Sequence, residues 1–184
     1  MDVRKLTYEE IFSKRPTLTK LKTMPRVPLF ALLENIRSMH NVGSIFRSSD
    51  GARLQHLYLC GYTAVPPRKE IDKTALGATD SVPWTFRRDA LETVRLLKKR
   101  DIKIVVLEHT SQSVTYTEAD YTFPLCLVVG NEVDGVSPEV VGEADISIEL
   151  PMLGLKQSLN VSVAYGVALY HLLYKYLKIN DVKY

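Results

Sequence analysis

Two short apolar runs constrain the fold of this chain more than any other feature of its sequence. Leu125–Val129 is continuously apolar, and Ile102–Leu107 is rich in β-branched residues. Such runs are typical of parallel strands that are covered on both faces. Because helix-like segments alternate with them, we predict an α/β fold with a mostly parallel sheet and helices on both faces.

The rest of the chain alternates between the same two patterns. Further strands are expected at 28–33, 57–60, 83–86 and 146–150, and helices at 7–14, 41–53, 88–100, from 138 onward and at 158–176. Asn41, Ser137 and Ser158 are suitable N-caps for three of these helices. A length of 184 residues suits one well-buried domain and is short for two.

Positive charge is concentrated at the N-terminus. The whole chain has a net charge of +3, whereas residues 1–27 hold seven basic and three acidic side chains. A basic arm favours a polyanionic partner, although a solvated, poorly ordered terminus would have the same composition. We therefore divide the chain into a basic N-terminal extension (1–27), one domain (28–178) and a C-terminal tail (179–184).

The cysteines and the hydropathy pattern predict a cytoplasmic protein. Cys60 and Cys126 lie inside apolar runs without metal-site spacing or a disulfide framework, which is typical of buried thiols in a reducing compartment. No apolar segment has the length of a signal peptide or a transmembrane helix, so we expect no membrane association. The four histidines also lack ligand spacing, and we expect no bound metal.

Three polar loops are the candidate ligand-binding segments, because open α/β sheets bind ligands where apolar strands end in such loops. Their sequences are Asn41-Val-Gly-Ser-Ile-Phe-Arg47, Val129-Gly-Asn-Glu-Val-Asp-Gly135 and Leu150-Pro-Met-Leu-Gly-Leu-Lys-Gln-Ser-Leu-Asn-Val161. The chain has no P-loop and no GxGxxG motif. It also has no evident Ser-His-Asp or Cys-His arrangement, so an enzyme of this sequence would act by positioning a reactive cofactor.

Each loop taken alone has a structural interpretation beside the functional one. Arg47 suits a phosphate, but it could be a solvated side chain and Asn41 only a cap. Gly130 would let a ligand approach the backbone closely, and Glu132 places a carboxylate at a strand end. A plain strand-to-helix connection would have a similar composition. Ser158 could be only a cap, or its apolar loop and exposed amides could hold an adenine-like ring.

Together the three loops resemble the motifs of the TrmH/SpoU-type ribose 2′-O-methyltransferases of the SPOUT superfamily. The likeness covers about residues 28–178, with all motifs in order. The matching positions are Asn41, Gly43 and Arg47, then Gly130, Asn131, Glu132 and Gly135, then Pro151, Met152, Gly154 and 158–164. The segments Gly61-Tyr-Thr and 73–78 are similar to the family as well.

This resemblance implies S-adenosylmethionine as the methyl donor and a ribose 2′-hydroxyl of transfer or ribosomal RNA as the acceptor. The implied cofactor contacts are Leu107, Gly130, Leu150, Met152, Ser158 and Leu159. The implied catalytic residues are Arg47, Asn41, Glu132, Ser158 and Asn160, with Arg47 beside the ribose and Asn41 on the RNA. The family fold has a C-terminal trefoil knot, and its members are usually homodimers with the active site at the interface.

Arg47 is expected to anchor an RNA phosphate and stabilise negative charge on the attacking oxygen, because a guanidinium is not normally deprotonated in proteins. The chain departs from the family at Arg53, where a Gly is usual. A left-handed backbone would strain Arg53, so we expect a slightly different turn. We expect no separate RNA-binding domain, which leaves recognition to the basic arm, the second subunit and the C-terminal tail.

Two other functions fit parts of the sequence. A catalytically silent RNA-binding protein of the same fold would show no turnover, and a small-molecule methyltransferase would act independently of salt. The segment 158–176 is apolar around much of its circumference. A dimer interface would bury the apolar side chains that one core-facing stripe does not need. A helix buried on several sides within one chain would bury them as well.

Overall fold

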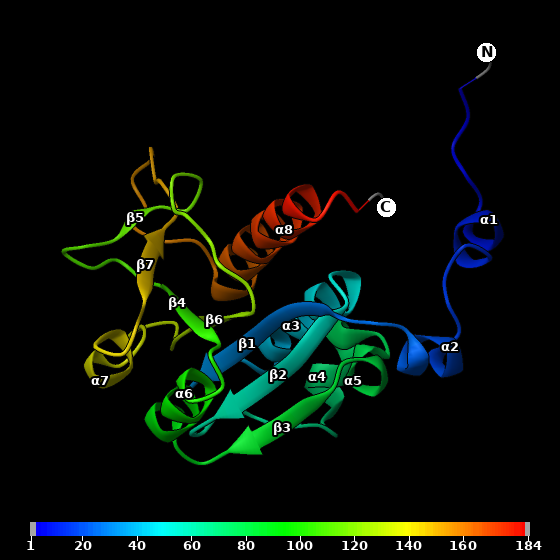
Figure 1. The fold of residues 1–184 in the computed structure, drawn as a ribbon. Coiled ribbons are helices and arrows are strands. Elements are labelled where there is room, and N and C mark those ends of the chain that lie inside the picture. The colour runs from blue at the N-terminus through cyan, green and yellow to red at the C-terminus, as the bar shows by residue number, and fades with distance from the viewer. Residues whose placement is uncertain (1–2, 183–184) are drawn as a thin grey trace.

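The computed structural model describes residues 3–182 and is built on one seven-stranded sheet (Figure 1). The strand order is β3-β2-β1-β6-β4-β7-β5, and every adjacent pair is parallel. The strands are β1 (Val27–Glu34), β2 (Leu54–Cys60), β3 (Trp84–Arg87), β4 (Lys103–Leu107), β5 (Val114–Thr115), β6 (Leu125–Val129) and β7 (Ile146–Glu149). The predicted α/β fold with a parallel sheet is confirmed.

Helices lie on both faces of this sheet, as predicted. They are α1 (Tyr8–Phe12), α2 (Leu18–Thr23), α3 (Met39–Gly51), α4 (Lys69–Ala75), α5 (Ala78–Ser81), α6 (Ala90–Lys98), α7 (Pro138–Val141) and α8 (Val161–Ile179). One core lies under α3, α4, α5 and α8, and a second lies under α6 and α7. Leu127 belongs to the first core and Val128 to the second, because successive side chains of β6 point to opposite faces.

Two of the three predicted helix caps are wrong. Ser38, not Asn41, caps α3, because its hydroxyl accepts a hydrogen bond from the Asn41 amide at 3.3 Å. Asn160, not Ser158, caps α8, since its side-chain oxygen accepts from the amide of Ser162 at 2.9 Å. Ser137 does precede α7, but its hydroxyl is turned away and donates to Glu34 at 2.7 Å.

Arg53 has a left-handed backbone, with φ at 51°, so the expectation of a different turn is wrong. Hydrogen bonds hold its peptide groups in this conformation. The Arg53 amide donates to the Asp50 carbonyl at 2.9 Å, and the Arg53 carbonyl accepts from the Val27 amide at 3.1 Å. The chain therefore tolerates the strain that a glycine would avoid.

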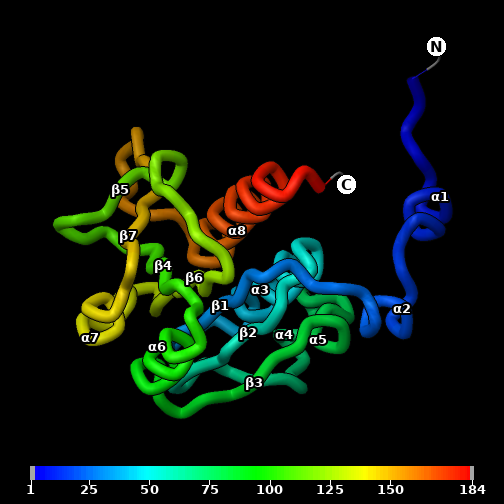
Figure 2. The backbone as a smooth tube through the Cα atoms, viewed as in Figure 1, coloured from blue at the N-terminus to red at the C-terminus, as the bar shows by residue number. Residues whose placement is uncertain are grey.

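The basic N-terminal segment stands apart from the sheet. Helices α1 and α2 contain no buried residue, and Figures 1 and 2 show both beside the domain rather than packed over it. Arg4 and Glu10 form an ion pair at 2.6 Å within this segment. No helix within residues 3–182 has both the length and the apolar character needed to span a membrane.

Candidate active site

A cavity of about 400 Å³ opens at the carboxyl ends of β4, β6 and β7. These strands are parallel, so their ends meet at one edge of the sheet, where the loop leading into α8 covers them. All six residues predicted to contact the cofactor line this cavity: Leu107, Gly130, Leu150, Met152, Ser158 and Leu159. The prediction that the second and third loops share one pocket is confirmed.

The cavity lining is acidic. Glu108, Glu132, Asp134 and Glu149 line it, and its lining contains no lysine or arginine. His109 is the one lining residue that can carry a positive charge. Such a site favours a cationic ligand over a polyanion, and its leucines and Met152 provide apolar surface. Both properties fit S-adenosylmethionine, whose sulfonium is positive.

Glu132 joins the first loop to the second. Its carboxylate accepts hydrogen bonds from the amides of Arg37 and Ser38, both at 3.0 Å, and from the Asn41 side chain at 2.8 Å. Burial alone would raise the pKa of Glu132, but these donors together lower it below its ordinary value. The carboxylate is therefore ionised at neutral pH and fixes the start of α3 against the β6 loop.

Asn41 continues this network to the third loop. Its side-chain nitrogen donates to Glu132, and its side-chain oxygen accepts from Asn160 at 3.1 Å. Asn41 is buried, with 9% of its surface exposed. Its amide is thus occupied in joining the three predicted catalytic residues, and RNA contact by Asn41 stays a prediction.

Of the other two predicted catalytic residues, Ser158 lies at the cavity and Arg47 does not. Ser158 lines the cavity with an exposed side chain. Arg47 is exposed on α3 and does not line the cavity of its own chain. Within residues 3–182 the Arg47 side chain has no hydrogen-bond or ion-pair partner. Its guanidinium is therefore available to a partner outside this chain.

Asn131 is a residue whose role the sequence analysis did not identify. Its side-chain nitrogen donates to the Asn35 carbonyl at 2.9 Å and to the Tyr62 hydroxyl at 2.6 Å, and its oxygen accepts from the amide of Val133 at 2.7 Å. Gly130 precedes it, and a Cβ there would lie 2.2 Å from the Gly135 backbone. Gly130 therefore allows the loop to fold back on itself, in addition to lining the cavity.

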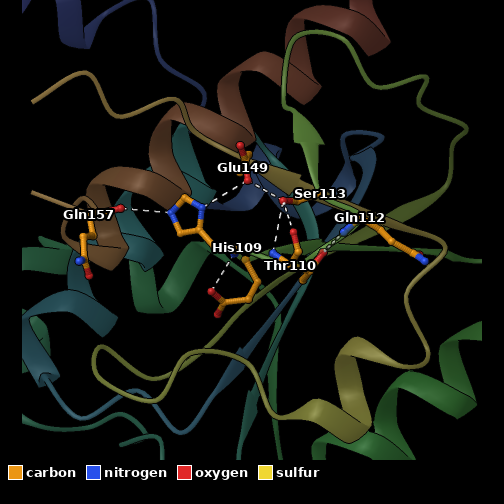
Figure 3. Close-up of polar contacts among 7 residues, drawn as sticks. His109, Thr110, Gln112, Ser113, Glu149 and Gln157 are labelled. Atoms are coloured by element: carbon orange, nitrogen blue, oxygen red, sulfur yellow. Dashed lines mark hydrogen bonds and ion pairs between the residues drawn. The ribbon is translucent and has the colours of Figure 1, made fainter.

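The sequence analysis also missed a cluster of polar residues around His109 at the rim of the cavity (Figure 3). His109 follows β4, and its ring lies between the Glu149 carboxylate and the Gln157 carbonyl. The only signal in the sequence is that His109 and Glu149 lie at or just beyond strand ends, which many surface residues share. Within residues 3–182, no group of three or more His, Cys, Asp or Glu side chains is arranged to hold a metal ion.

Comparison with known proteins decides the family. The SpoU rRNA methylase family model matches residues 28–170. The tRNA (guanosine(18)-2′-O)-methyltransferase of Aquifex aeolicus is 40% identical over 146 residues, covering 77% of this chain and 67% of that protein. The chain belongs to the SpoU methylase family. The enzyme of the same name from Thermus thermophilus is 32% identical over 92% of this chain and 81% of its own length.

Solved structures of SpoU methylases share the fold. The crystal structure of the A. aeolicus TrmH/SpoU tRNA modifying enzyme matches with a TM-score of 0.79 and 33% identity, over 90% of this chain and 84% of that one. An AdoMet-bound rRNA methyltransferase from Sinorhizobium meliloti matches with a TM-score of 0.76 and 26% identity, over 85% of this chain and 60% of that one. The chain spans 61% of the length of the Escherichia coli tRNA (guanosine(18)-2′-O)-methyltransferase, to which it is 32% identical.

Proposed function

We propose that this SpoU methylase transfers a methyl group from S-adenosylmethionine to a ribose 2′-hydroxyl of RNA, with transfer RNA as its first candidate substrate. The observation that carries the proposal is the acidic cavity whose walls come from the second and third motifs, joined to the first motif by Asn41 and Glu132. Transfer RNA comes first because the Aquifex and Thermus relatives are named as tRNA enzymes.

The cavity residues fit the proposed cofactor. Backbone groups at Gly130 and the apolar side chains of Leu150, Met152 and Leu159 are suited to a nucleoside, while the carboxylates favour a cation. When bound, S-adenosylmethionine supplies an electrophilic methyl group. The same carboxylates would bind the uncharged thioether product less strongly, which favours its release.

The proposed role of Arg47 is to bind an RNA phosphate and stabilise negative charge that develops on the 2′-oxygen. Glu132, Asn160 and Ser158 are proposed to keep the loops and the ribose in position. Because Arg47 lies outside the cavity of its own chain, we propose that it serves the cavity of a second copy. The knotted C-terminal segment and the homodimer belong to this proposal.

Helix α8 supports the proposed homodimer. One face is buried in the chain, through Tyr165, Ala168, Leu169, Leu172 and Leu173. The opposite side exposes an apolar stripe of Val163, Val167, Tyr170 and Tyr174, each between 39% and 52% exposed. The helix is therefore not buried on several sides within one chain, and a second copy would cover the stripe.

Two further parts of the proposal rest on charge and on thiol chemistry. The basic N-terminal segment, with exposed Lys20 and Lys22 on α2, is proposed to bind the RNA backbone.

Cys60 and Cys126 are buried free thiols, and burial raises the pKa of Cys60 to about 12. Inert thiols of this kind support the proposed cytoplasmic location.

The test is transfer of radiolabelled methyl from S-adenosylmethionine to purified transfer RNA and to ribosomal RNA. Wild type should label one pool, and Arg47→Ala should lose the label while its cofactor affinity stays within about threefold, because the proposed contacts of Arg47 are with the RNA and not with the cofactor. Arg47→Lys should fail as well, since the planar fork is lost. Cofactor binding without label in either pool would favour the catalytically silent alternative.

A further inference from the structure

The rim of the cavity contains a side-chain cluster that no motif includes. The His109 ring lies between two acceptors from different parts of the chain (Figure 3). Its Nδ1 is 3.3 Å from Oε2 of Glu149 at the end of β7, and its Nε2 is 3.2 Å from the carbonyl oxygen of Gln157. One side chain thus connects the ends of β4 and β7 to the loop that leads into α8.

Glu149 is itself held in place. The Ser113 hydroxyl donates to Oε2 of Glu149 at 2.5 Å, from a turn in which the Thr110 amide donates to Ser113 at 3.3 Å. The bonds from Ser113 and His109 lower the pKa of Glu149 below its ordinary value. When the His109 ring carries both protons, this ionised and fixed carboxylate accepts from Nδ1–H and directs Nε2–H at the Gln157 carbonyl.

The loop that Gln157 belongs to has little else to hold it. Leu153 and Leu155 are 99% and 97% exposed. Among residues 3–182, the contact from His109 is the only hydrogen bond that ties any group of residues 151–159 to the rest of the chain. Yet Met152, Ser158 and Leu159 of this loop line the cavity. Among the described residues, the His109 bond is therefore the one direct hydrogen-bond anchor of this loop, whose C-terminal end is held by Asn160 through Asn41.

We infer that His109 is a positioning residue that holds the 151–159 loop against the cavity, through its Nε2–H bond to the Gln157 carbonyl. The inference rests on the proposed function in that the cavity is the cofactor site. Both partners of the ring are acceptors, so the two bonds form together only in the doubly protonated ring, and the neutral Nε2–H form keeps the loop bond alone.

Two conservative variants separate the two bonds. A glutamine at 109 places its amide nitrogen near the former Nε2 and can still donate to Gln157, whereas an asparagine places its amide near Nδ1 and reaches only Glu149. Affinity for S-adenosylmethionine would be measured by calorimetry for His109→Gln and His109→Asn, with Ser111→Ala as the control. Ser111 lies in the same turn, and its exposed side chain makes no hydrogen bond among the described residues.

His109→Asn should weaken cofactor binding about tenfold, the effect of one lost hydrogen bond. Its kcat at saturating cofactor and its KM for RNA should stay within about threefold of wild type. His109→Gln and Ser111→Ala should bind the cofactor like wild type. Equal losses in both His109 variants would overturn the inference, because the loop bond would then not be the one that matters.

Limited trypsin digestion of the cofactor-free protein tests the inference independently of methyl transfer. Cleavage after the exposed Lys156 of this loop should be faster in His109→Asn than in wild type and His109→Gln, while the domain core stays uncut. An unchanged rate of cleavage after Lys156 in His109→Asn would refute the inference. Since no RNA or cofactor enters this measurement, it stands even if wild type methylates no RNA and the proposed function fails.

Discussion

At the scale of single residues, the site is organised by side chains that bind one another. The network runs from Asn160 through Asn41 to Glu132, and then to the amides of Arg37 and Ser38. Resemblance to the family identified Asn41, Glu132 and Asn160, but not their contacts. Asn41 and Glu132 are 91 residues apart in sequence, and no local pattern encodes such a pairing.

Glu132→Gln should destabilise the protein by about 1 kcal/mol, because one of its acceptor oxygens becomes a donor that faces other donors. The folded pKa of Glu132 is lowered, so its ionised form stabilises the fold above the ordinary value of 4.5, and this contribution is lost as the pH falls further. Thermal unfolding from pH 7 to pH 3 should show a smaller acid-induced loss in the variant. An identical pH dependence would contradict this account of Glu132.

At the scale of secondary-structure elements, apolar periodicity predicted most strands and helices but not where they begin. Ser38 and Asn160 cap α3 and α8 because their side chains reach free amides, and serine and asparagine elsewhere in the same loops are equally good caps by type. The short elements α2, α4, α5 and β5 were missed. They have two to seven residues, which is too few to show a period.

Gly43→Ala should destabilise the protein by about 1–3 kcal/mol. A Cβ at Gly43 would lie 2.2 Å from the Ile71 carbonyl oxygen, so α3 and α4 would have to separate. The control is Gly154→Ala, where nothing lies within 4 Å of the added Cβ. Chemical denaturation should show a loss only in the first variant, and equal stability of the two would contradict the close packing of α3 and α4.

Arg53→Gly should stabilise the protein by up to about 1 kcal/mol, because glycine adopts the left-handed backbone of Arg53 without strain. The gain is limited because glycine has more conformational entropy in the unfolded chain, which folding must remove. Arg53→Ala removes the same charge and keeps a Cβ, so it should give no gain. Differential scanning calorimetry of the three proteins checks this. A gain in both variants would assign the effect to the charge of Arg53 instead of its backbone.

At the scale of the whole molecule, the fold and the cavity were predictable because parallel strands place their carboxyl ends at one edge. Distances between motifs on separate elements were not, since they depend on how those elements pack. The position of Arg47 is the clearest example. Arg47 lies outside the cavity of its own chain, and the proposed second copy would place it beside a partner cavity.

Val167→Asp should convert the proposed dimer into a monomer, because it places a charge in the middle of the exposed apolar stripe of α8. Methyl transfer should fall with the dimer fraction, since Arg47 would then lack a partner cavity. Sedimentation velocity and activity would be compared with Gln55→Asp, an exposed change on β2. A wild type that is monomeric and active would contradict the shared site.

The central claim is that this SpoU methylase methylates a ribose 2′-hydroxyl. The most direct measurement is mass spectrometry of nucleosides from transfer RNA that has been treated with the protein and S-adenosylmethionine, beside RNA treated with Arg47→Ala. The account predicts one nucleoside with its additional methyl on the sugar, present with wild type and absent with the variant. A methyl on the base, or the same sugar methylation with Arg47→Ala, would contradict it.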